Sequence, residues 1–445
     1  MQELPTMKTG YTIGILLLVL AVAGAGYFGF RSDPVVSVLS DTPFRKVYLV
    51  RTPGTGRVSL QLVFQTGAAD QPPPPGLLHY GEHLVWLSAF GRQERSVDRH
   101  SNAWTDSLTT GYLLDGERDA LPDLVASLAR VLDPVDLPVE FMLEERDIVQ
   151  REYDLRLVDN LDARVGEALK AAVYTGNPYA VSVMGTPQDI AGFTPEAAIA
   201  LTTATHRPEK AVLLVIGDVS PATLRAAMPD RPSVDAPLPP LPAFTLVPGE
   251  QLLRFPDDTA EPRMIWRRIV RLDAPQPLDL LETQLALLSD MFDTSLPGGL
   301  AGPLRYDAFV TSAFDISLWP LDGQHMEIRM VAYPDTGVTL EDMRAAFETA
   351  LEDTITAGFP ERTFTRVLAR FETYWPDWQD RGDTADWMAA YVADVASVRR
   401  EPLDIAALQA LQEQMDLASL NNLLKQFEND GRTVVAYIGP EGDLP

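Results

Sequence analysis

The spacing of hydrophobic residues predicts strands and helices along the whole chain. Val58–Phe64 alternates polar and apolar residues with a period of two, which is typical of a strand with one buried face. Ala211–Gly217 is a continuous apolar run that ends in glycine, as a buried strand does. Similar patterns predict further strands over residues 46–50, 101–113, 263–272, 325–332 and 433–440, and helices over 77–90, 119–132, 138–158, 163–173, 278–292, 340–357 and 361–374.

Proline divides this pattern into two halves. Residues 231–248 belong to a stretch with six prolines and little periodicity, which predicts an extended linker. Residues 32–230 and 249–445 would then form two similar lobes. Because residues 433–440 resemble 211–218, the halves indicate a duplication. We expect an α+β fold in which each lobe packs an antiparallel-rich sheet against helices.

The N-terminus predicts a membrane segment. Tyr11–Phe30 carries no charge, is flanked by Lys8 and Arg31, and is long enough to span a bilayer as a helix. We interpret residues 1–31 as a signal anchor. A cleaved signal peptide is the alternative, although its small-x-small sites lie inside the apolar run and not after it. Either interpretation places residues 32–445 outside the cytoplasm, and a periplasm suits an acidic domain without cysteine.

Charge and composition exclude several functions. The net charge is −27, from 63 acidic and 36 basic residues, and no basic stripe is present. We therefore expect no nucleic-acid binding and no docking on anionic lipid through charge. The chain has no cysteine, which excludes disulfides, thiolate metal sites and cysteine nucleophiles.

Two of the five histidines form a candidate metal site. His79 and His83 lie four residues apart in a predicted helix, with Glu82 between them, so all three share one face. This H-x-x-E-H spacing predicts a Zn²⁺ ion held by both imidazoles, with an open position for water. Glu82 would not bind the metal, but would take a proton from that water as general base.

The motif and several others resemble the insulinase/pitrilysin family of zinc peptidases, which includes mitochondrial processing peptidase. The similar segments are Asn102–Thr105 with Thr110–Tyr112, Glu144–Glu152, Val165–Leu169, Asn177–Tyr179, Met184–Gly185 and His206–Val219. The resemblance covers residues 41–445, loosely in the second half, and implies a metalloendopeptidase that cleaves peptides or unfolded segments.

The resemblance also implies further site residues. It makes Glu167 the third zinc ligand, whereas the residues alone leave Glu152, Asp154 and Asp162 as rivals. It places Asn102 on a strand beside the substrate, which would add to the sheet as an extra strand.

In the second half, Leu304-Arg305 matches the start of a family pattern in which an arginine and a tyrosine hold the substrate. The tyrosine position is Phe314 here, which has no hydroxyl, unless Tyr306 substitutes. The resemblance therefore implies a homo- or heterodimer with a homologous subunit that supplies an Arg/Tyr pair. Two alternatives to a peptidase remain: a non-catalytic assembly or chaperone-like homologue, and an exported zinc-binding module.

Overall fold

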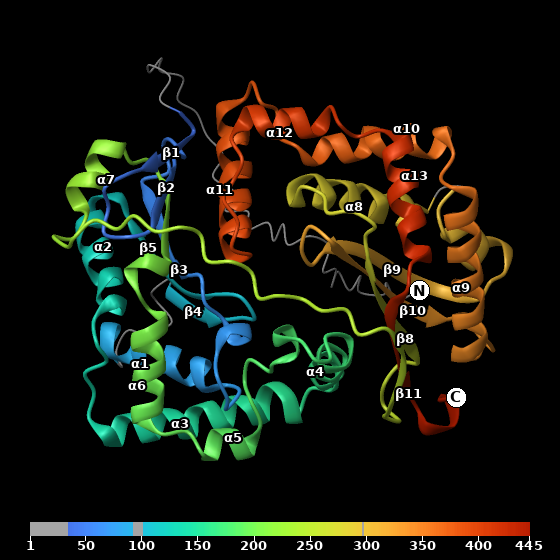
Figure 1. Cartoon of the computed structure of the whole chain (residues 1–445), viewed down its shortest axis with the longest axis horizontal. Helices are drawn as coiled ribbons and strands as arrows, with labels where there is room; N and C mark the ends of the chain where they lie inside the picture. Colours follow the sequence, from blue (N-terminus) through green and yellow to red (C-terminus); the bar gives the residue numbers. More distant parts are fainter. Residues whose placement is uncertain (1–33, 92–100, 296–297) are drawn as a thin grey trace, which may run out of the picture.

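The computed structural model describes residues 34–91, 101–295 and 298–445, which form two β-sheets packed with helices (Figure 1). The predicted α+β class is confirmed. In spatial order, the first sheet contains β1 (Val36–Leu39), β2 (Lys46–Val50), β6 (Ala211–Gly217), β3 (Arg57–Phe64), β5 (Thr110–Glu117) and β4 (Ser101–Thr105). The second contains β7 (Gly249–Pro256), β11 (Gly431–Gly439), β8 (Arg263–Arg271), β10 (His325–Pro334) and β9 (Thr311–Pro320).

The two sheets repeat one topology. In the first, β2 pairs in parallel with β6, and β6, β3, β5 and β4 follow in antiparallel order. In the second, β7 pairs in parallel with β11, and β11, β8, β10 and β9 follow in antiparallel order. This equivalence supports the predicted duplication, with β1 as an addition to the first lobe.

Each sheet packs one face against helices of its own half. The first lobe carries α1 (Leu77–Phe90), α2 (Leu121–Ala129), α3 (Val139–Tyr153), α5 (Pro187–Ala191), α6 (Pro195–Thr205) and α7 (Pro221–Ala227). The second carries α8 (Leu278–Asp293), α9 (Leu340–Ala357), α10 (Glu361–Phe371) and α13 (Leu417–Lys425), whereas α12 (Ile405–Gln412) joins a cluster with the first sheet. Strand alternation explains the arrangement, because Leu60 and Leu62 of β3 point to the same side and join the core that includes α1 and α2.

The opposite faces are covered by exchanged helices (Figure 1). Helix α4 (Leu161–Val173) belongs to the first half but packs its buried Leu169 with Ile269 and Ala436 of the second sheet. Helix α11 (Arg381–Ser397) belongs to the second half but packs on β2 and β6 of the first sheet. Each lobe therefore completes the other's core.

The predicted single strand over residues 101–113 is wrong, because it is a hairpin. The Asp106 carboxylate accepts hydrogen bonds from the backbone N–H groups of Leu108 and Thr109, both at 2.6 Å. This turn ends β4 at Thr105 and begins β5 at Thr110. A side-chain cap of this kind competes with the extended ladder, which the period-two pattern alone does not reveal.

The proline-rich stretch forms neither helix nor strand between residues 229 and 248. It crosses from the first lobe to the second along the surface (Figure 1). The Asn177 side chain fastens it, donating to the Thr245 carbonyl at 2.9 Å and accepting from the Thr245 N–H at 2.6 Å. The segment is thus an extended strap held by the first lobe.

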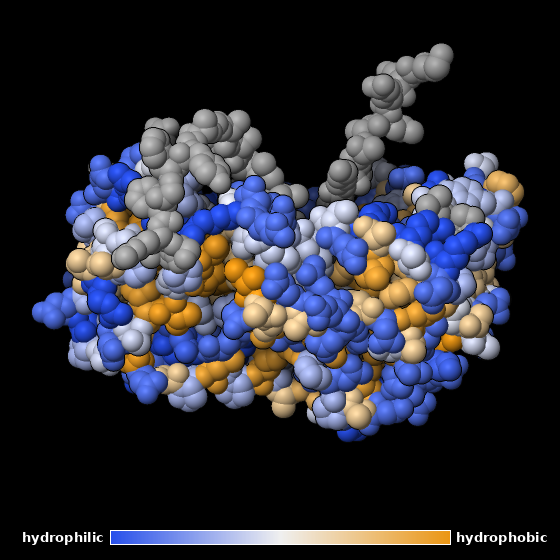
Figure 2. All heavy atoms as spheres, turned by 90° about the horizontal axis from the view of Figure 1, so that it is seen from above, coloured by the Kyte–Doolittle hydropathy of each residue, from blue (hydrophilic) through white to orange (hydrophobic). Residues whose placement is uncertain are grey.

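The predicted N-terminal span, Tyr11–Phe30, lies outside the described residues. Among the residues that the structure describes, none of the helices combines the length and the apolar character needed to cross a bilayer. Seen from above, the described surface is largely hydrophilic, with apolar residues in separate areas (Figure 2).

Candidate metal centre

Helix α1 carries the H-x-x-E-H segment into the interior. It begins after Gly76, whose φ of 84° is left-handed, and a Cβ there would lie 2.3 Å from the Met184 carbonyl oxygen. The polar residues of the motif are nearly enclosed, with His79 and Glu82 each 6% exposed. As predicted from the spacing, His79 and His83 are neighbours on this helix, with ring centroids 4.9 Å apart.

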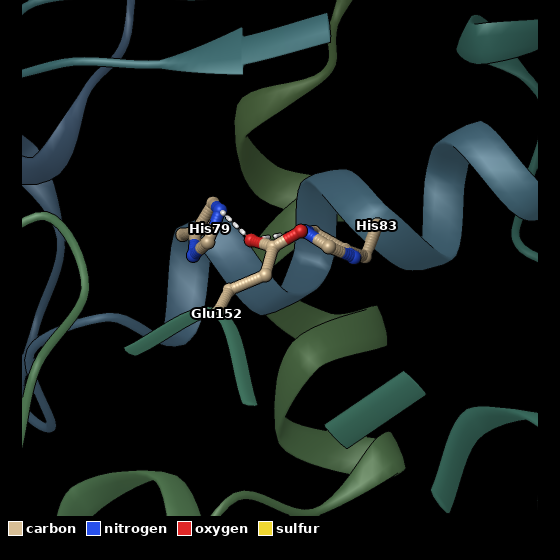
Figure 3. Close-up of side chains that lie close together, drawn as sticks. All are labelled: His79, His83 and Glu152. Atoms are coloured by element: carbon tan, nitrogen blue, oxygen red, sulfur yellow. Dashed lines mark ion pairs between the residues drawn. The ribbon is translucent and has the colours of Figure 1, made fainter. Parts of the chain in front are cut away.

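Helix α3 brings a carboxylate to the two histidines. Glu152 Oε2 lies 3.7 Å from His79 Nε2 and 3.6 Å from His83 Nε2 (Figure 3). One ligand atom from each of these residues lies within 4.8 Å of the other two. Among the described residues, His79, His83 and Glu152 form the one group of three or more His, Asp or Glu side chains whose ligand atoms are close enough to share a metal ion.

The donor set fits zinc. Two imidazole nitrogens and one carboxylate oxygen are the three protein ligands of many catalytic zinc sites. Glu152 Oε2 is buried and has no hydrogen-bond partner among the described residues. A buried carboxylate oxygen without a partner is costly, and a cation at the point where the three ligand atoms converge removes that cost.

The charges of the site are strongly coupled. Burial, reinforced by the neighbouring His83, lowers the pKa of His79 to about 3. Burial also opposes the charged form of His83, but the hydrogen bond to Glu145 and the close Glu152 carboxylate outweigh it and raise the His83 pKa to about 9. Burial would raise the pKa of Glu152, but contacts with His83 lower it to about 2. The site therefore favours a positive charge beside Glu152, and zinc would take the place of the His83 proton.

Glu145 is a site residue that the sequence analysis missed. It is 1% exposed, and its Oε2 lies 3.3 Å from His83 Nδ1, the ring nitrogen that does not face Glu152. A carboxylate in this position fixes the ring and its tautomer. The sequence contained a signal, because Glu145 and Glu152 are seven residues apart, which is two helical turns along one face of α3.

Glu82 contacts the first sheet. Its Oε2 accepts a hydrogen bond of 2.8 Å from Thr105 Oγ1 at the end of β4. Burial raises the pKa of Glu82, although His83 and the Thr105 hydrogen bond oppose the shift. A buried carboxylate next to the histidines has the surroundings of a general base.

The structure does not bring the predicted third ligand, Glu167, into the group of converging ligand atoms. Glu152, one of the rivals weighed from the sequence, stands there instead. The reason is the exchange of helices: Glu167 lies on α4, which leaves the first lobe to pack on the second sheet. Its charge acts on Lys170, where it opposes the burial that lowers the Lys170 pKa.

The two predicted substrate residues lie in different lobes. Asn102 is exposed on β4, the edge strand of the first sheet. Arg305 lies in the second lobe, and its guanidinium is 5.8 Å from the Tyr306 ring centroid. A pocket of about 250 Å³ adjoins it, lined by Asp293, Ser295, Ala301, Arg305, Phe314 and Arg370. Phe314 and Arg305 thus line the same pocket.

Comparisons with known proteins agree with the predicted family. Residues 46–187 match the family model of insulinase, peptidase family M16. The chain is 26% identical over 153 residues to a probable mitochondrial-processing peptidase subunit beta of Schizosaccharomyces pombe, covering 33% of each chain. It is 28% identical over 158 residues to an uncharacterized zinc protease of Mycobacterium leprae, covering 32% of this chain and 34% of that protein. The matches thus span about a third of these curated relatives.

Solved structures extend the likeness in fold to both lobes. A protease from Helicobacter pylori has a TM-score of 0.74 at 16% identity, covering 92% of this chain and all of that one. The first half of the periplasmic protease PqqL from Escherichia coli has a TM-score of 0.76 at 13% identity, covering 93% of both chains. An inactive M16 peptidase domain from Pseudomonas fluorescens has a TM-score of 0.69 at 14% identity, covering 91% of this chain and 98% of that one. The resemblance to the insulinase family is confirmed.

Proposed function

We propose that this chain, an insulinase-family protein by its first lobe, is a zinc-dependent endopeptidase that hydrolyses peptides or unfolded protein segments. The observation that carries the proposal is the convergence of His79, His83 and Glu152 around one point, with an unsatisfied carboxylate oxygen among them. We assign these three residues as the zinc ligands. Glu145 orients the His83 ring from the side opposite Glu152.

Bound zinc supplies Lewis-acid activation of a water molecule and of the scissile carbonyl. Glu82 accepts the proton of the attacking water and later returns it to the leaving amine, because its carboxylate is buried beside the histidines without being one of the ligands. Asn102, exposed on the edge strand β4, lies where an extended substrate backbone can pair with the sheet.

The first test is cleavage of a quenched fluorescent peptide library by the full chain, with and without a chelator. We expect chelator-sensitive cleavage, and a loss of about 100- to 10,000-fold in Glu82→Gln, because the amide cannot accept a proton. The zinc content of this variant should stay at one ion per chain. Glu140→Gln makes the same chemical change at an exposed position of α3 and should leave cleavage unchanged.

The ligand assignment is tested by a matched pair of variants. We expect Glu152→Gln to lose zinc in metal analysis and Glu167→Gln to retain it, since only Glu152 reaches both histidines. The reverse result would restore Glu167 as the ligand. Protein that holds zinc yet cleaves nothing, alone or with a partner, would assign a binding or assembly role to the chain.

We further propose that the active form is a dimer with a homologous subunit. The supporting observation is that Phe314, not a tyrosine, adjoins Arg305 in the second-lobe pocket, so this pocket lacks the tyrosine hydroxyl of the family's Arg/Tyr pair. Coexpression with a neighbouring homologue should give a stable complex with higher kcat/KM than the chain alone. Failure of any homologue to bind or to raise activity would reject this partner.

For its location, we propose an exported chain that is held at the membrane by residues 1–31 and faces the periplasm. The uncharged run Tyr11–Phe30 supports this proposal. Fractionation of cells should find the protein with the membrane and sensitive to protease added to spheroplasts. Recovery in the cytoplasmic fraction would reject it.

A further inference from the structure

We infer that Thr105 is a positioning residue for the reaction, because its hydroxyl holds the carboxylate of Glu82 in one orientation. The inference rests on the proposed function, since it gives Thr105 a role only if Glu82 transfers the proton. The observation is the hydrogen bond of 2.8 Å from Thr105 Oγ1 to Glu82 Oε2. This length is that of a well-formed O–H···O bond.

Strand geometry explains why this side chain faces α1. Thr105 and Ala103 lie two residues apart on β4 and therefore point to the same side of the sheet. Ala103 packs against the core that contains Val85 and Trp86 of α1. Thr105 pairs with Thr110 of β5, so the hydroxyl lies where the edge of the sheet meets the motif helix.

The hydrogen bond changes what Glu82 can do. The last torsion of a glutamate side chain has a broad, roughly two-fold preference, so an unrestrained carboxylate samples many orientations. Thr105 engages Oε2 and thereby leaves Oε1 to accept the proton. Because Glu82 is only 6% exposed, solvent offers little competition for this bond. Such preorganisation accelerates a proton transfer without contributing to substrate binding.

The β4–β5 turn that follows Thr105 is held by residues of both lobes. The next residue, Asp106, caps the β4–β5 turn, and its carbonyl accepts from the Ala68 N–H at 2.8 Å. Arg399 of the second lobe donates from Nε to the Leu108 carbonyl at 2.7 Å and from Nη1 to Asp70 Oδ1 at 3.0 Å. The turn is therefore clamped one residue beyond Thr105, and the hydroxyl has a defined place.

Three substitutions test the inference. Thr105→Val removes the hydroxyl with little change of shape, Thr105→Ser keeps it, and Thr110→Val removes a hydroxyl that instead donates to the Thr66 carbonyl. We expect kcat to fall up to about 100-fold in Thr105→Val with KM and zinc content unchanged. Thr105→Ser should recover most of the activity, and Thr110→Val should retain it.

An unchanged kcat in Thr105→Val, or an equal loss in Thr105→Ser, would overturn the inference while leaving the peptidase intact. Should Thr105→Val fold poorly, Thr105→Ala removes the same hydroxyl. Should the wild type itself fail to cleave, the proposed function fails. Crystal structures of the zinc-loaded wild type and of Thr105→Val then test whether the Thr105 hydroxyl holds the Glu82 carboxylate in place. A Glu82 carboxylate that stays within about 0.5 Å of its wild-type place without the hydroxyl would then overturn the inference.

Discussion

Helices α1 and α8 occupy equivalent places in the two lobes but carry different side chains. Each follows the central strand of its sheet, β3 or β8, and precedes the edge strand, β4 or β9. Helix α1 buries His79 and Glu82 and holds His83 partly buried, and α3 places Glu145 and Glu152 beside the two histidines. Helix α8 contains no histidine and buries mainly apolar side chains. The duplicated fold thus supplies two equivalent positions, and only the first has the donor set for a metal.

The first lobe also depends on a stabilising contact from the second lobe. Arg399 of the second lobe, whose side chain is 1% exposed, binds the Leu108 carbonyl and the Asp70 carboxylate and so fixes the β4–β5 turn of the first lobe. This dependence gives the largest effect that we expect. Arg399→Met leaves the Asp70 carboxylate and the Leu108 carbonyl without their buried partner, and should lower the free energy of unfolding by about 3 kcal/mol in urea denaturation.

The control for this variant is Arg57→Met, which breaks an ion pair to Glu117 on the surface, where the side chains are 45% and 72% exposed. Its cost should stay below about 1 kcal/mol. Equal costs for the two substitutions would show that the clamp does not couple the lobes.

The exchange of helices gives the next effect. Leu169→Ala truncates a side chain of α4 that is buried on the second sheet, and should cost about 2–3 kcal/mol. Because α11 is buried in turn on the first sheet, both lobes should unfold in one transition. Fluorescence, which follows the tryptophans, and far-UV circular dichroism should give the same midpoint. Separate midpoints for the two probes would contradict the mutual dependence.

The smallest effect concerns the end of α8. Burial, together with Asp315 and Asp290, raises the pKa of Asp293 to about 7. The folded protein therefore binds this proton more tightly than the unfolded chain, and stability is lost as the pH rises from the ordinary carboxyl range to about 7. Asp293→Asn should raise Tm by a few degrees at pH 8, and by less at pH 5. A gain that is equal at both pH values would contradict the assignment.

The sequence predicted most elements well where periodicity was strong. Helix 77–90 and strand 211–217 have their predicted bounds, because both are buried segments between clear breaks. The β4–β5 turn was missed because it depends on the Asp106 side chain. Strand β9 and helix α11 were not predicted either; α11 is amphipathic toward a sheet that lies in the other half of the chain, so its partner is not near in sequence.

The candidate site was predictable only in its local part. His79, Glu82 and His83 lie on one helix, so their shared face follows from spacing alone. Glu152 reaches them through the packing of α3 on α1, and the choice between it and Glu167 depended on which helix stays in the first lobe. Family landmarks favoured Glu167, and tertiary geometry favours Glu152.

The exchange of helices has a consequence for biosynthesis. Strands β2 and β6 are complete when Gly217 leaves the ribosome, but α11, which covers their second face, ends at Ser397. At about 5–20 residues per second, the roughly 180 intervening residues take about ten to forty seconds to make. During that time Tyr48, Val50, Val212 and Leu214 present an uncovered apolar face on a nascent chain. Such a face is a substrate for chaperones, and the first lobe reaches its native state only after nearly the whole polypeptide has been synthesised.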